Sequence, residues 1–591
     1  MISAESPSLI AQFFAQAERL ADRPFLWAKR DGIWHPTSWR QAADQTRALA
    51  RGLKRLGLQP GERVILVAEN RPEWLIADHA IMAAGGVTVP AYTTNGVNDH
   101  HHVLTDSGAR MAIVSTTALA AKLLPAVLRA PQIEHVIAIE PMRHNQTDGG
   151  YQLHQWGTVV AQGAAHKNIP LAEPSRTSLA CLIYTSGTGG APKGVMLSHG
   201  AILHTCEGAY DVLKPLGLSD EVFLSFLPLS HSYEHTAGQF VPVALGAQIY
   251  YAEGVDALAG NMLEVKPTFM TAVPRLYENM QNRIMRGIER SGPRARKLFL
   301  RTVALGRKRM AGALSFAERI EDFALTLLVR RKVKARFGGR LKAMVSGGAP
   351  LNPEVGSFFT ALGVCILQGY GQTESAPVIT VNRPGQVKIA TVGPVLKHTE
   401  VKLAEDGEIL VRGELVMQGY WKQPRATEEA IRDGWLHTGD IGVFDADGYL
   451  TITDRKKDII VNSGGDNISP QRVEGFLTLE PEISQAMVSG DKRPYLVALL
   501  VPDEQAAFDW AKANNKIQDL SLLARDSAFR DHLAAAVTRV NDSLSIIERV
   551  RHFLIAEEPF TTANGEMTPT LKIRRHVLKA RYGERLEGLY R

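Results

Sequence analysis

Short apolar runs alternate with longer amphipathic segments through the first three quarters of the chain. Runs such as Arg63–Glu69 and Met111–Ser115 have the length of buried strands, whereas Trp74–Ala84 has the length and spacing of a helix. This alternation predicts a layered α/β body in which the sheets are largely parallel. Further strands are predicted at His135–Ile139, Leu182–Thr185, Phe223–Pro228, Gln248–Ala252, Phe269–Val273, Leu341–Ser346 and Val364–Gln368.

The pattern changes after about Pro384. Glu400–Arg412 and Phe444–Thr453 each predict a hairpin around an Asp-Gly turn, which indicates a small β-rich subdomain. A charged stretch follows, and then a smaller α+β unit with a hairpin at Ser484–Val501 and helices at Glu504–Asn514 and Asp526–Leu544. We therefore predict an N-terminal domain at 1–453 that includes the β-rich subdomain at 385–453, a hinge at 454–458 and a mobile C-terminal lid domain at 459–591.

Composition and charge narrow the class of protein. Of the 591 residues, 45% are hydrophobic and 22% are charged, as in ordinary soluble proteins. Part of the net charge of +6 lies in two basic clusters, at 283–309 and 330–340. Solvated helix faces are the favoured explanation. A surface for anionic lipid or nucleotide phosphates is the alternative, and nucleic acid is disfavoured because no recognition motif accompanies the charge.

The N-terminal segment and the cysteines bear on location. Residues 1–20 predict a mature amphipathic helix and not a signal peptide, because no basic segment precedes an apolar run. No apolar stretch approaches the ~20 residues that span a bilayer. The three cysteines are far apart, which argues against a disulfide framework or a zinc site. We expect a cytoplasmic protein, with peripheral contact at the inner face of a membrane as an option; the oligomeric state is open, with a homodimer as one option.

The segment Tyr184–Gly194 carries the strongest local signal for chemistry. It follows an apolar strand, and its hydroxyls, glycines and lysine suit phosphate oxygens. It is not a Walker A loop, because Pro192 precedes the lysine and Gly194 replaces the Ser or Thr of that motif. From this segment alone, phosphate binding and a plain turn both remain open. The residues that would bind phosphate are Thr185, Ser186, Gly187, Thr188 and Lys193.

Five further motifs follow this loop in order. They are Ser346–Leu351, Gln368–Glu374, Trp435–Asp440, Asp454–Asp458 and Thr568–Lys572. Together with the loop they resemble the ordered motifs of the acyl-adenylate-forming superfamily, which includes acyl-CoA synthetases, beetle luciferases and peptide-synthetase adenylation domains. The resemblance covers nearly the whole chain, and six spaced motifs are far more specific than one. The loop departs from the family pattern at Gly189, where Thr is usual.

The resemblance implies an ATP and Mg²⁺ site. One wall of an adenine pocket would come from the Gly-Gly-Ala motif, and Tyr370 would stack on the opposite face. Thr373 would hydrogen-bond the α-phosphate, and Glu374 would hold Mg²⁺ together with Thr188. Asp440 and Arg455 would bind the ribose hydroxyls. The glycine-motif residues assigned to this site are Gly347, Gly348, Ala349, Gly369 and Gly371.

The resemblance also implies two half-reactions in one cleft. Lys572 would reach the α-phosphate and the carboxylate during adenylate formation, since an ammonium stabilises the developing negative charge. Lys457 would be the hinge at which the C-terminal domain rotates. After rotation, the small-residue loop Ser463-Gly464-Gly465 would line the tunnel for coenzyme A. By spacing alone, Lys572 is one of several cations in a basic tail.

The acid substrate is predicted from the segment Leu227–His235. It resembles the acid-pocket motif of fatty acyl-CoA synthetases, with His231 near the carboxylate or as a packed residue, and Tyr233 as a gate on an acyl tunnel. The expected function is a long-chain fatty acid–CoA ligase that uses ATP and coenzyme A. The alternatives are a fatty acyl-AMP ligase that loads a carrier protein, a CoA ligase for another hydrophobic acid, a luciferase-like oxidase and a non-catalytic nucleotide or lipid binder.

Overall fold

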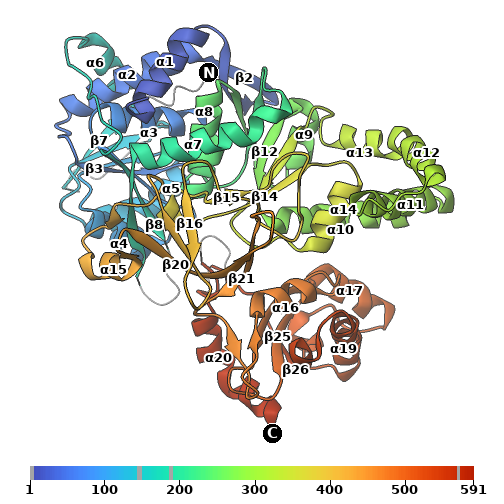
Figure 1. The fold of residues 1–591 in the computed structure, drawn as a ribbon. Coiled ribbons are helices and arrows are strands. Elements are labelled where there is room, and N and C mark those ends of the chain that lie inside the picture. The colour runs from blue at the N-terminus through green and yellow to red at the C-terminus, as the bar shows by residue number, and fades with distance from the viewer. Residues whose placement is uncertain (1–5, 143–149, 186–190, 563, 569–572) are drawn as a thin grey trace.

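A computed structural model describes residues 6–142, 150–185, 191–562, 564–568 and 573–591 (Figure 1). The chain forms a large α/β body with two eight-stranded sheets, a small β-rich subdomain and a separate C-terminal lobe. The predicted fold class is confirmed, since the strands predicted from apolar runs all occur within one to three residues of their expected bounds.

The first sheet has the strand order β18-β9-β8-β4-β3-β5-β6-β7. Its central strands are parallel, while β9 and β18 are antiparallel additions at one edge. The bounds are β3 (Arg63–Val67), β4 (Val87–Pro90), β5 (Met111–Val114), β6 (His135–Ala138), β7 (Gln152–Gln155), β8 (Leu179–Thr185), β9 (Lys193–Ser198) and β18 (Gly419–Tyr420).

The second sheet has the order β15-β14-β13-β12-β10-β11-β1-β2. The middle of this sheet is parallel, and the antiparallel strands β15 and β2 form its two edges. The bounds are β1 (Pro24–Arg30), β2 (Ile33–Ser38), β10 (Val222–Ser225), β11 (Gln248–Tyr251), β12 (Phe269–Ala272), β13 (Ala343–Ser346), β14 (Ile366–Tyr370) and β15 (Thr380–Val381).

One apolar core joins the two sheets through the helices between them. Its buried members include Phe13 of α1, Trp74 of α3, Ile202 of α7, Val64 of the first sheet and Phe269 of the second. The predicted N-terminal helix is confirmed as α1, which begins where the Ser8 hydroxyl accepts from the Ala11 N–H. The helices around the sheets are α1 (Leu9–Leu20), α2 (Trp39–Arg55), α3 (Pro72–Ala83), α4 (Val97–Ser107), α5 (Thr117–Val127), α6 (Trp156–Ala165), α7 (His199–Leu213), α8 (Val241–Leu245), α9 (Leu258–Val265) and α14 (Pro353–Ala361).

A group of helices extends from the second sheet between β12 and β13. We call residues 274–336 the helical arm; in Figure 1 it projects sideways from the body, in green and yellow-green. The helix α12 lies at its outer end and is tied to α11 by ion pairs, among them Lys308 with Glu318 and Arg301 with Glu321. The arm consists of α10 (Pro274–Glu289), α11 (Pro293–Met310), α12 (Phe316–Leu325), the π-helical turn η3 (Thr326–Arg330) and α13 (Arg331–Arg336).

The β-rich subdomain contains both predicted hairpins. β16 pairs with β17, and β20 pairs with β21, each in antiparallel register. Gly407 and Gly448 have φ of +82° and +77°, a left-handed conformation that the turns require and that glycine adopts without strain. The elements are β16 (Glu400–Leu403), β17 (Glu408–Arg412), α15 (Pro424–Ala430), β19 (Ile431–Arg432), β20 (Trp435–Phe444) and β21 (Leu450–Arg455).

The C-terminal lobe has apolar clusters of its own, and Figure 1 shows it as a separate mass below the body. Its predicted hairpin and helices are present, and β26 adds a parallel strand beside β25. The charged stretch 454–458 begins with the last two residues of β21 and continues into the connection to β22. The elements are β22 (Ile460–Val461), β23 (Asn467–Ile468), α16 (Pro470–Leu477), β24 (Ile483–Ser489), β25 (Leu496–Pro502), α17 (Glu504–Ala513), α18 (Leu520–Leu523), α19 (Ser527–Asp542), β26 (Val550–Ile555) and α20 (Arg575–Glu587).

Candidate active site

Two of the predicted motifs lie side by side at the edge of the second sheet that the carboxyl ends of its parallel strands form. β13 ends at Ser346 and leads into Gly347-Gly348-Ala349, while β14 ends at Tyr370 and leads into Gly371 and Thr373-Glu374. These strands are parallel neighbours, with Ser346 opposite Gln368. The carboxyl ends of such strands meet at one edge, which is where open α/β sheets bind ligands. The structure therefore brings together the residues predicted to form the two faces of the adenine pocket.

The glycines at this edge are required by close packing. A Cβ at Gly371 would lie 1.9 Å from the carbonyl oxygen of Pro377, and one at Gly347 would lie 3.0 Å from the ring of Tyr233. Gly348 has φ of +81°, which favours glycine. Side chains at these positions would displace the loops that follow β13 and β14, so the Gly-rich sequence fixes the shape of this edge.

Asp440 lies at the centre of a polar cluster that joins the second sheet to the β-rich subdomain. The Tyr370 hydroxyl donates to Asp440 Oδ2 at 2.7 Å, and Arg455 Nε donates to Oδ1 at 3.0 Å. Asp440 and Arg455 are direct partners on β20 and β21. Asp440 is buried and Arg455 is half-buried. The cluster thus unites three residues predicted to bind the nucleoside, which are far apart in the sequence.

The two side chains that donate to Asp440 both have raised pKa values. Burial, together with the Asp440 carboxylate, raises the pKa of Tyr370 well above its usual value, so the phenol remains a donor. Burial alone would lower the pKa of Arg455, but the Asp440 carboxylate raises it on balance. Both donors therefore keep their protons, and they hold the carboxylate in one orientation. A carboxylate held in this way can still accept from hydroxyl groups of a ligand, since each oxygen has more than one lone pair.

Glu374 is held by a tyrosine that the sequence did not single out. The Tyr420 hydroxyl donates to Glu374 Oε1 at 2.9 Å, and the Met417 N–H donates to the Glu374 carbonyl at the same distance. Lys193 Nζ lies 4.9 Å from the centroid of the Tyr420 ring. Tyr420 therefore connects the residue predicted to bind Mg²⁺ with the lysine predicted to bind phosphate. It reaches this place because β18 pairs with β9, a long-range contact that no local pattern indicates.

The segment predicted to bind the acid lies beside Thr373. Ser232 and Thr373 share a hydrogen bond of 2.9 Å between their hydroxyl oxygens, and sequence reasoning did not identify Ser232. His231 Nδ1 accepts from the Tyr233 N–H at 3.2 Å. Tyr233 is buried, and its hydroxyl donates to the carbonyl of Val345 at 2.9 Å. In this arrangement the Tyr233 ring is packed beneath Gly347 and anchored to β13 at its polar tip.

A buried polar layer lies behind this segment, at the start of the π-helical turn η2 (Glu234–Phe240). Ser225 and Thr271 each donate a hydroxyl to the carboxylate of Glu234, which is fully buried. Burial raises the pKa of Glu234 to about 7. The neighbouring His235 forms a pair with Asp78 at 2.9 Å, and both side chains are inaccessible to solvent. These groups fix the backbone that carries His231, Ser232 and Tyr233.

The phosphate-binding prediction is only partly within the described residues. Thr185 and Lys193 are cross-strand partners on the antiparallel strands β8 and β9. Ser186, Gly187 and Thr188 lie outside the described residues, as does Gly189. Lys572 also lies outside them. The roles assigned to these residues stay predictions from the sequence.

The residues predicted to act in the second half-reaction belong to the C-terminal lobe and its connection. Lys457 is exposed, between the end of β21 and the start of β22. In the loop Ser463-Gly464-Gly465, Asn462 Oδ1 accepts from the N–H groups of Gly464 and Asp466, each at 2.9 Å. Gly465 has φ of +86°. The loop is therefore a tight, exposed turn with little side-chain bulk.

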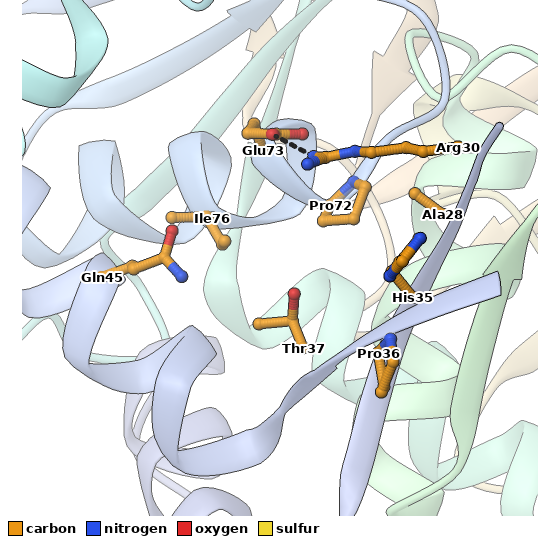
Figure 2. A pocket seen from close by; sticks show the side chains of 9 residues that line it. All are labelled: Ala28, Arg30, His35, Pro36, Thr37, Gln45, Pro72, Glu73 and Ile76. Atoms are coloured by element: carbon orange, nitrogen blue, oxygen red, sulfur yellow. Dashed lines mark hydrogen bonds and ion pairs between the residues drawn. The ribbon is translucent and has the colours of Figure 1, made fainter. Parts of the chain in front are cut away.

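A hollow elsewhere in the body contains none of the predicted site residues. Figure 2 shows that its lining comes from β1, β2, α2 and α3, and includes His35, Gln45 and the pair Arg30–Glu73, whose atoms are 3.5 Å apart. It lies between the N-terminal hairpin and the helices α2 and α3, and the chemistry predicted for the chain does not depend on it.

The side chains that could bind a metal ion at this site are few. Within the described ranges, no group of three or more His, Cys, Asp or Glu side chains is arranged to hold a metal ion. Glu374 uses Oε1 to accept from Tyr420, and Oε2 accepts no hydrogen bond from the described part of the chain. One carboxylate plus the oxygens of a bound phosphate is a donor set that suits Mg²⁺. Over the same part of the chain, no helix is long and apolar enough to cross a membrane.

Comparisons with protein families and curated proteins agree over nearly the full length. The family described as AMP-binding enzyme matches residues 13–421, and the AMP-binding enzyme C-terminal domain matches 457–591. Long-chain-fatty-acid–CoA ligase FadD15 of Mycobacterium bovis is 36% identical, with 95% of this chain and 93% of that protein covered. The peroxisomal long chain acyl-CoA synthetase 7 of Arabidopsis thaliana is 31% identical, with 99% and 87% covered.

Solved structures share the fold at lower identity. The adenylation domain of a carboxylate reductase from Mycobacterium chelonae has a TM-score of 0.75 at 22% identity, and covers 100% of this chain and 92% of its own. The anthranilate CoA ligase AuaEII in complex with anthranoyl-AMP has a TM-score of 0.72 at 21% identity, with 97% and 96% covered. The arrangement of body, β-rich subdomain and C-terminal lobe is therefore that of known adenylate-forming proteins.

Proposed function

Because this chain belongs to the AMP-binding enzyme family, we propose that it is an ATP-dependent ligase that joins a long-chain fatty acid to the thiol of coenzyme A. The observation that carries the proposal is the cluster of Asp440, Tyr370 and Arg455 beside Thr373 and Glu374. Relatives at 30% identity or more over nearly the whole chain are named as long-chain fatty acid–CoA ligases or long-chain acyl-CoA synthetases.

The first half-reaction forms an acyl-adenylate. A carboxylate oxygen of the fatty acid attacks the α-phosphorus of ATP, and the bond from that phosphorus to pyrophosphate breaks. Asp440 accepts from the ribose hydroxyls, Tyr370 and the Gly347–Ala349 segment enclose the adenine, and Thr373 donates to the α-phosphate. Lys572 supplies positive charge where negative charge develops. The Ser232–Thr373 bond supports this arrangement, since it links the segment proposed to bind the acid to the residue proposed to bind the α-phosphate.

Magnesium fits this site through Glu374 and the phosphate oxygens. When bound, the ion would neutralise charge on the phosphates of ATP. The Tyr420 hydroxyl donates a hydrogen bond to the Glu374 carboxylate and keeps its proton, since burial, together with the carboxylate, raises the pKa of Tyr420. Thr188, which the sequence assigns as a second ligand, is part of the same proposal.

The second half-reaction transfers the acyl group to sulfur. The thiolate of coenzyme A attacks the carbonyl carbon of the acyl-adenylate, the bond from that carbon to the AMP oxygen breaks, and AMP leaves. Rotation at Lys457 would withdraw Lys572 and bring in Ser463-Gly464-Gly465. A turn with so little side-chain bulk can pass close to an extended pantetheine chain.

Pyrophosphate release, measured with a panel of acids in the presence and absence of coenzyme A, tests the proposal. We expect release with palmitate and oleate that rises on addition of coenzyme A, with AMP and an acyl-CoA as the products. Adenylate formation that coenzyme A does not discharge would indicate a carrier-protein acceptor. Release with other hydrophobic acids alone would correct the substrate, and consumption of oxygen would indicate oxidase chemistry. Binding of ATP without turnover of any acid would overturn the proposal.

The location of the enzyme is part of the same proposal. A long-chain fatty acid partitions into bilayers, so a ligase of this kind would meet its substrate at a membrane surface. We propose a cytoplasmic enzyme with peripheral contact to a membrane. Fatty acid, ATP and coenzyme A are its proposed binding partners, and nucleic acid is not among them.

A further inference from the structure

The outer helix of the helical arm displays an apolar stripe to solvent. Phe316, Ile320 and Phe323 of α12 follow one another at intervals of four and three residues, which places them on one face of the helix. Leu327 follows four residues later in the turn η3, and we call these four residues the α12 stripe. Their side chains are 80%, 60%, 68% and 42% exposed. Single exposed apolar residues are common, but a stripe that includes two nearly free phenylalanines is not, and such patches mark interaction surfaces.

The opposite face of α12 is packed against the body, so the stripe is a second apolar face of the same helix. Asp322 and Leu325 are buried. Arg330 is buried as well, donates to Asp322 Oδ1 at 2.6 Å and donates to the Ala361 carbonyl at 2.7 Å. The helix is thus fixed on the body by one side, and it presents a second apolar side to the exterior. Figure 1 shows α12 at the outer end of the arm, away from the sheets that carry the candidate active site.

The region around the stripe is strongly basic. Residues 283–340 contain 17 Lys and Arg and four Asp and Glu, a net charge of +13, whereas the whole chain carries +6. The rest of the chain is therefore net negative. Three of the four acidic residues are ion-paired within the arm, by Arg301, Lys308, Arg309 and Arg330. Exposed cations that form no ion pair in the described part of the chain include Arg296, Lys297, Arg319, Arg331, Lys332 and Lys334.

We propose that the outer end of the helical arm docks on an anionic lipid bilayer, with the α12 stripe inserted among the acyl chains and the surrounding cations at the headgroups. Apolar side chains on one face flanked by Lys and Arg are the features of helices that lie in a membrane interface. Arg319 flanks the stripe by helical spacing, and anionic lipid attracts each such cation. The choice of a bilayer rests on the proposed function only in that a fatty acid substrate resides there.

A second copy of this chain is the less suitable occupant. A two-fold contact would place the stripe of one copy on the stripe of the other, and would bring two regions of net charge +13 together. Like charges at an interface oppose association, whereas a negative lipid surface complements them. The charge of the arm therefore selects the membrane over self-association.

Flotation of the full-length protein with lipid vesicles tests this proposal. Vesicles of phosphatidylcholine with about 30% phosphatidylglycerol should bind the protein, and vesicles of phosphatidylcholine alone should bind at least about tenfold less. The triple variant Phe316→Ser, Ile320→Ser, Phe323→Ser should lose about tenfold or more in binding to the anionic vesicles. The variant Arg319→Gln, Lys332→Gln, Lys334→Gln should weaken binding, and about 0.5 M salt should weaken wild-type binding in the same direction.

A matched control removes apolar residues of similar exposure elsewhere. Ile517, Leu522 and Ile546 are 70%, 52% and 74% exposed on the C-terminal lobe, and their triple change to Ser should leave vesicle binding unchanged. Both variants should retain the melting temperature of the wild type, since the altered side chains lie in solvent. With octanoate, which is soluble, ligase activity in the arm variant should equal that of the wild type.

Two results would overturn the proposal. The first is undiminished binding of the Phe316, Ile320 and Phe323 variant to anionic vesicles. The second is a wild-type dimer in sedimentation that this variant converts to a monomer, which would assign the stripe to a protein interface. The experiments distinguish the ligase activity from the docking surface. Vesicle binding without acyl-CoA formation would refute the ligase activity, and acyl-CoA formation without vesicle binding would refute the docking surface.

Discussion

The Tyr370 hydroxyl donates to Oδ2 of Asp440 at 2.7 Å, across 70 residues of sequence. This bond links the last residue of β14 in the second sheet to β20 in the β-rich subdomain, and Arg455 extends the link to β21. The hinge predicted at Lys457 follows only two residues later. The cluster that would recognise the nucleoside thus lies just before the point where the chain enters the C-terminal lobe.

The change Asp440→Asn should weaken ATP binding more than the change Tyr370→Phe. Asn keeps the shape but removes the charge that accepts from the ribose and pairs with half-buried Arg455, whereas Phe removes one hydroxyl. Loss of a hydrogen bond to a charged group costs about 1.5–3 kcal/mol, so we expect KM for ATP to rise about 10- to 100-fold in Asp440→Asn. Steady-state kinetics with ATP as the varied substrate measures both variants, and a larger effect of Tyr370→Phe would contradict the central place of Asp440.

The change Tyr420→Phe should raise the concentration of Mg²⁺ that half-saturates adenylate formation. The phenol holds Glu374 Oε1 at 2.9 Å, and without this donor the carboxylate loses its fixed orientation. We expect a rise of about 3- to 10-fold, in line with about 1 kcal/mol for a hydrogen bond. Tyr449→Phe is a matched control, since its hydroxyl donates to the Gln386 carbonyl away from Glu374. If both variants needed the same concentration of Mg²⁺, Tyr420 would have no specific role in Mg²⁺ binding.

Buried Glu234 predicts a stability that falls as the pH rises. Its pKa in the folded protein is about 7, above its ordinary value of 4.5, because the carboxylate is removed from water. The folded state therefore holds this proton more tightly than the unfolded state. The resulting stability is fully present below pH ~4.5 and is lost as the pH rises through ~7, by an amount on the order of 3 kcal/mol.

The variant Glu234→Gln tests this sign. The amide oxygen can accept from one of the hydroxyls of Ser225 and Thr271, and the amide NH2 can donate to the other. Because the amide does not ionise, the variant should melt higher than the wild type at pH 8 and show little difference at pH 5. Melting temperatures across this pH range measure the effect. Glu354→Gln, at a carboxylate that is 58% exposed, should change neither value by much. A destabilisation of Glu234→Gln at pH 8 as large as that at pH 5 would refute the raised pKa.

Most of the fold could be predicted from the sequence because strands, helices and tight turns each leave a pattern within a short stretch of residues. Apolar runs flanked by helical segments identified the parallel strands, and the Asp-Gly turns at Gly407 and Gly448 identified both hairpins of the β-rich subdomain. The hairpin β1–β2 was not predicted. It joins the second sheet beside β11, and this pairing depends on residues more than 200 positions later in the chain.

In the candidate site, too, local patterns could be predicted from the sequence and long-range contacts could not. The strand-end motifs carry Tyr370, Thr373 and Glu374, which lie at the end of β14 and in the turn that follows it. Tyr420 and Ser232 were missed because their roles arise from contacts over 46 and 141 residues, which no spacing in the sequence encodes. Ser232 lies within a motif that the sequence did single out, so a hydroxyl between His231 and Tyr233 was the one signal that could have identified it.

Alternation of the C-terminal lobe should be visible when the two half-reactions are assayed separately. We expect Lys572→Ala to abolish acyl-adenylate formation from ATP and acid while sparing thioester formation from a supplied acyl-adenylate. Gly464→Leu should do the reverse, because a bulky side chain in the turn after Asn462 would obstruct the coenzyme A tunnel. Equal loss of both half-reactions in either variant would count against the rotation.

The hinge itself can be tested with proline at position 457. The N–H of Lys457 makes no backbone hydrogen bond in the described part of the chain, while its neighbours do: Lys456 donates to the Gly439 carbonyl and Asp458 to the Arg455 carbonyl, each at 2.9 Å. Proline at 457 therefore removes no backbone bond of this arrangement, but it fixes φ near −65° and restricts rotation. We expect Lys457→Pro to retain one half-reaction and to slow the other by about tenfold or more.

The matched variant Lys457→Ala separates the backbone from the side chain. Ala leaves φ free, so both half-reactions should proceed near wild-type rates if rotation alone is required of this residue. If Lys457→Ala were as impaired as Lys457→Pro, the exposed ammonium would be the functional group, and the hinge would have to lie elsewhere. If Lys457→Pro retained both half-reactions, the lobe would not need to rotate at this bond, and the assignment of Lys572 and Gly464 to opposite orientations would fail with it.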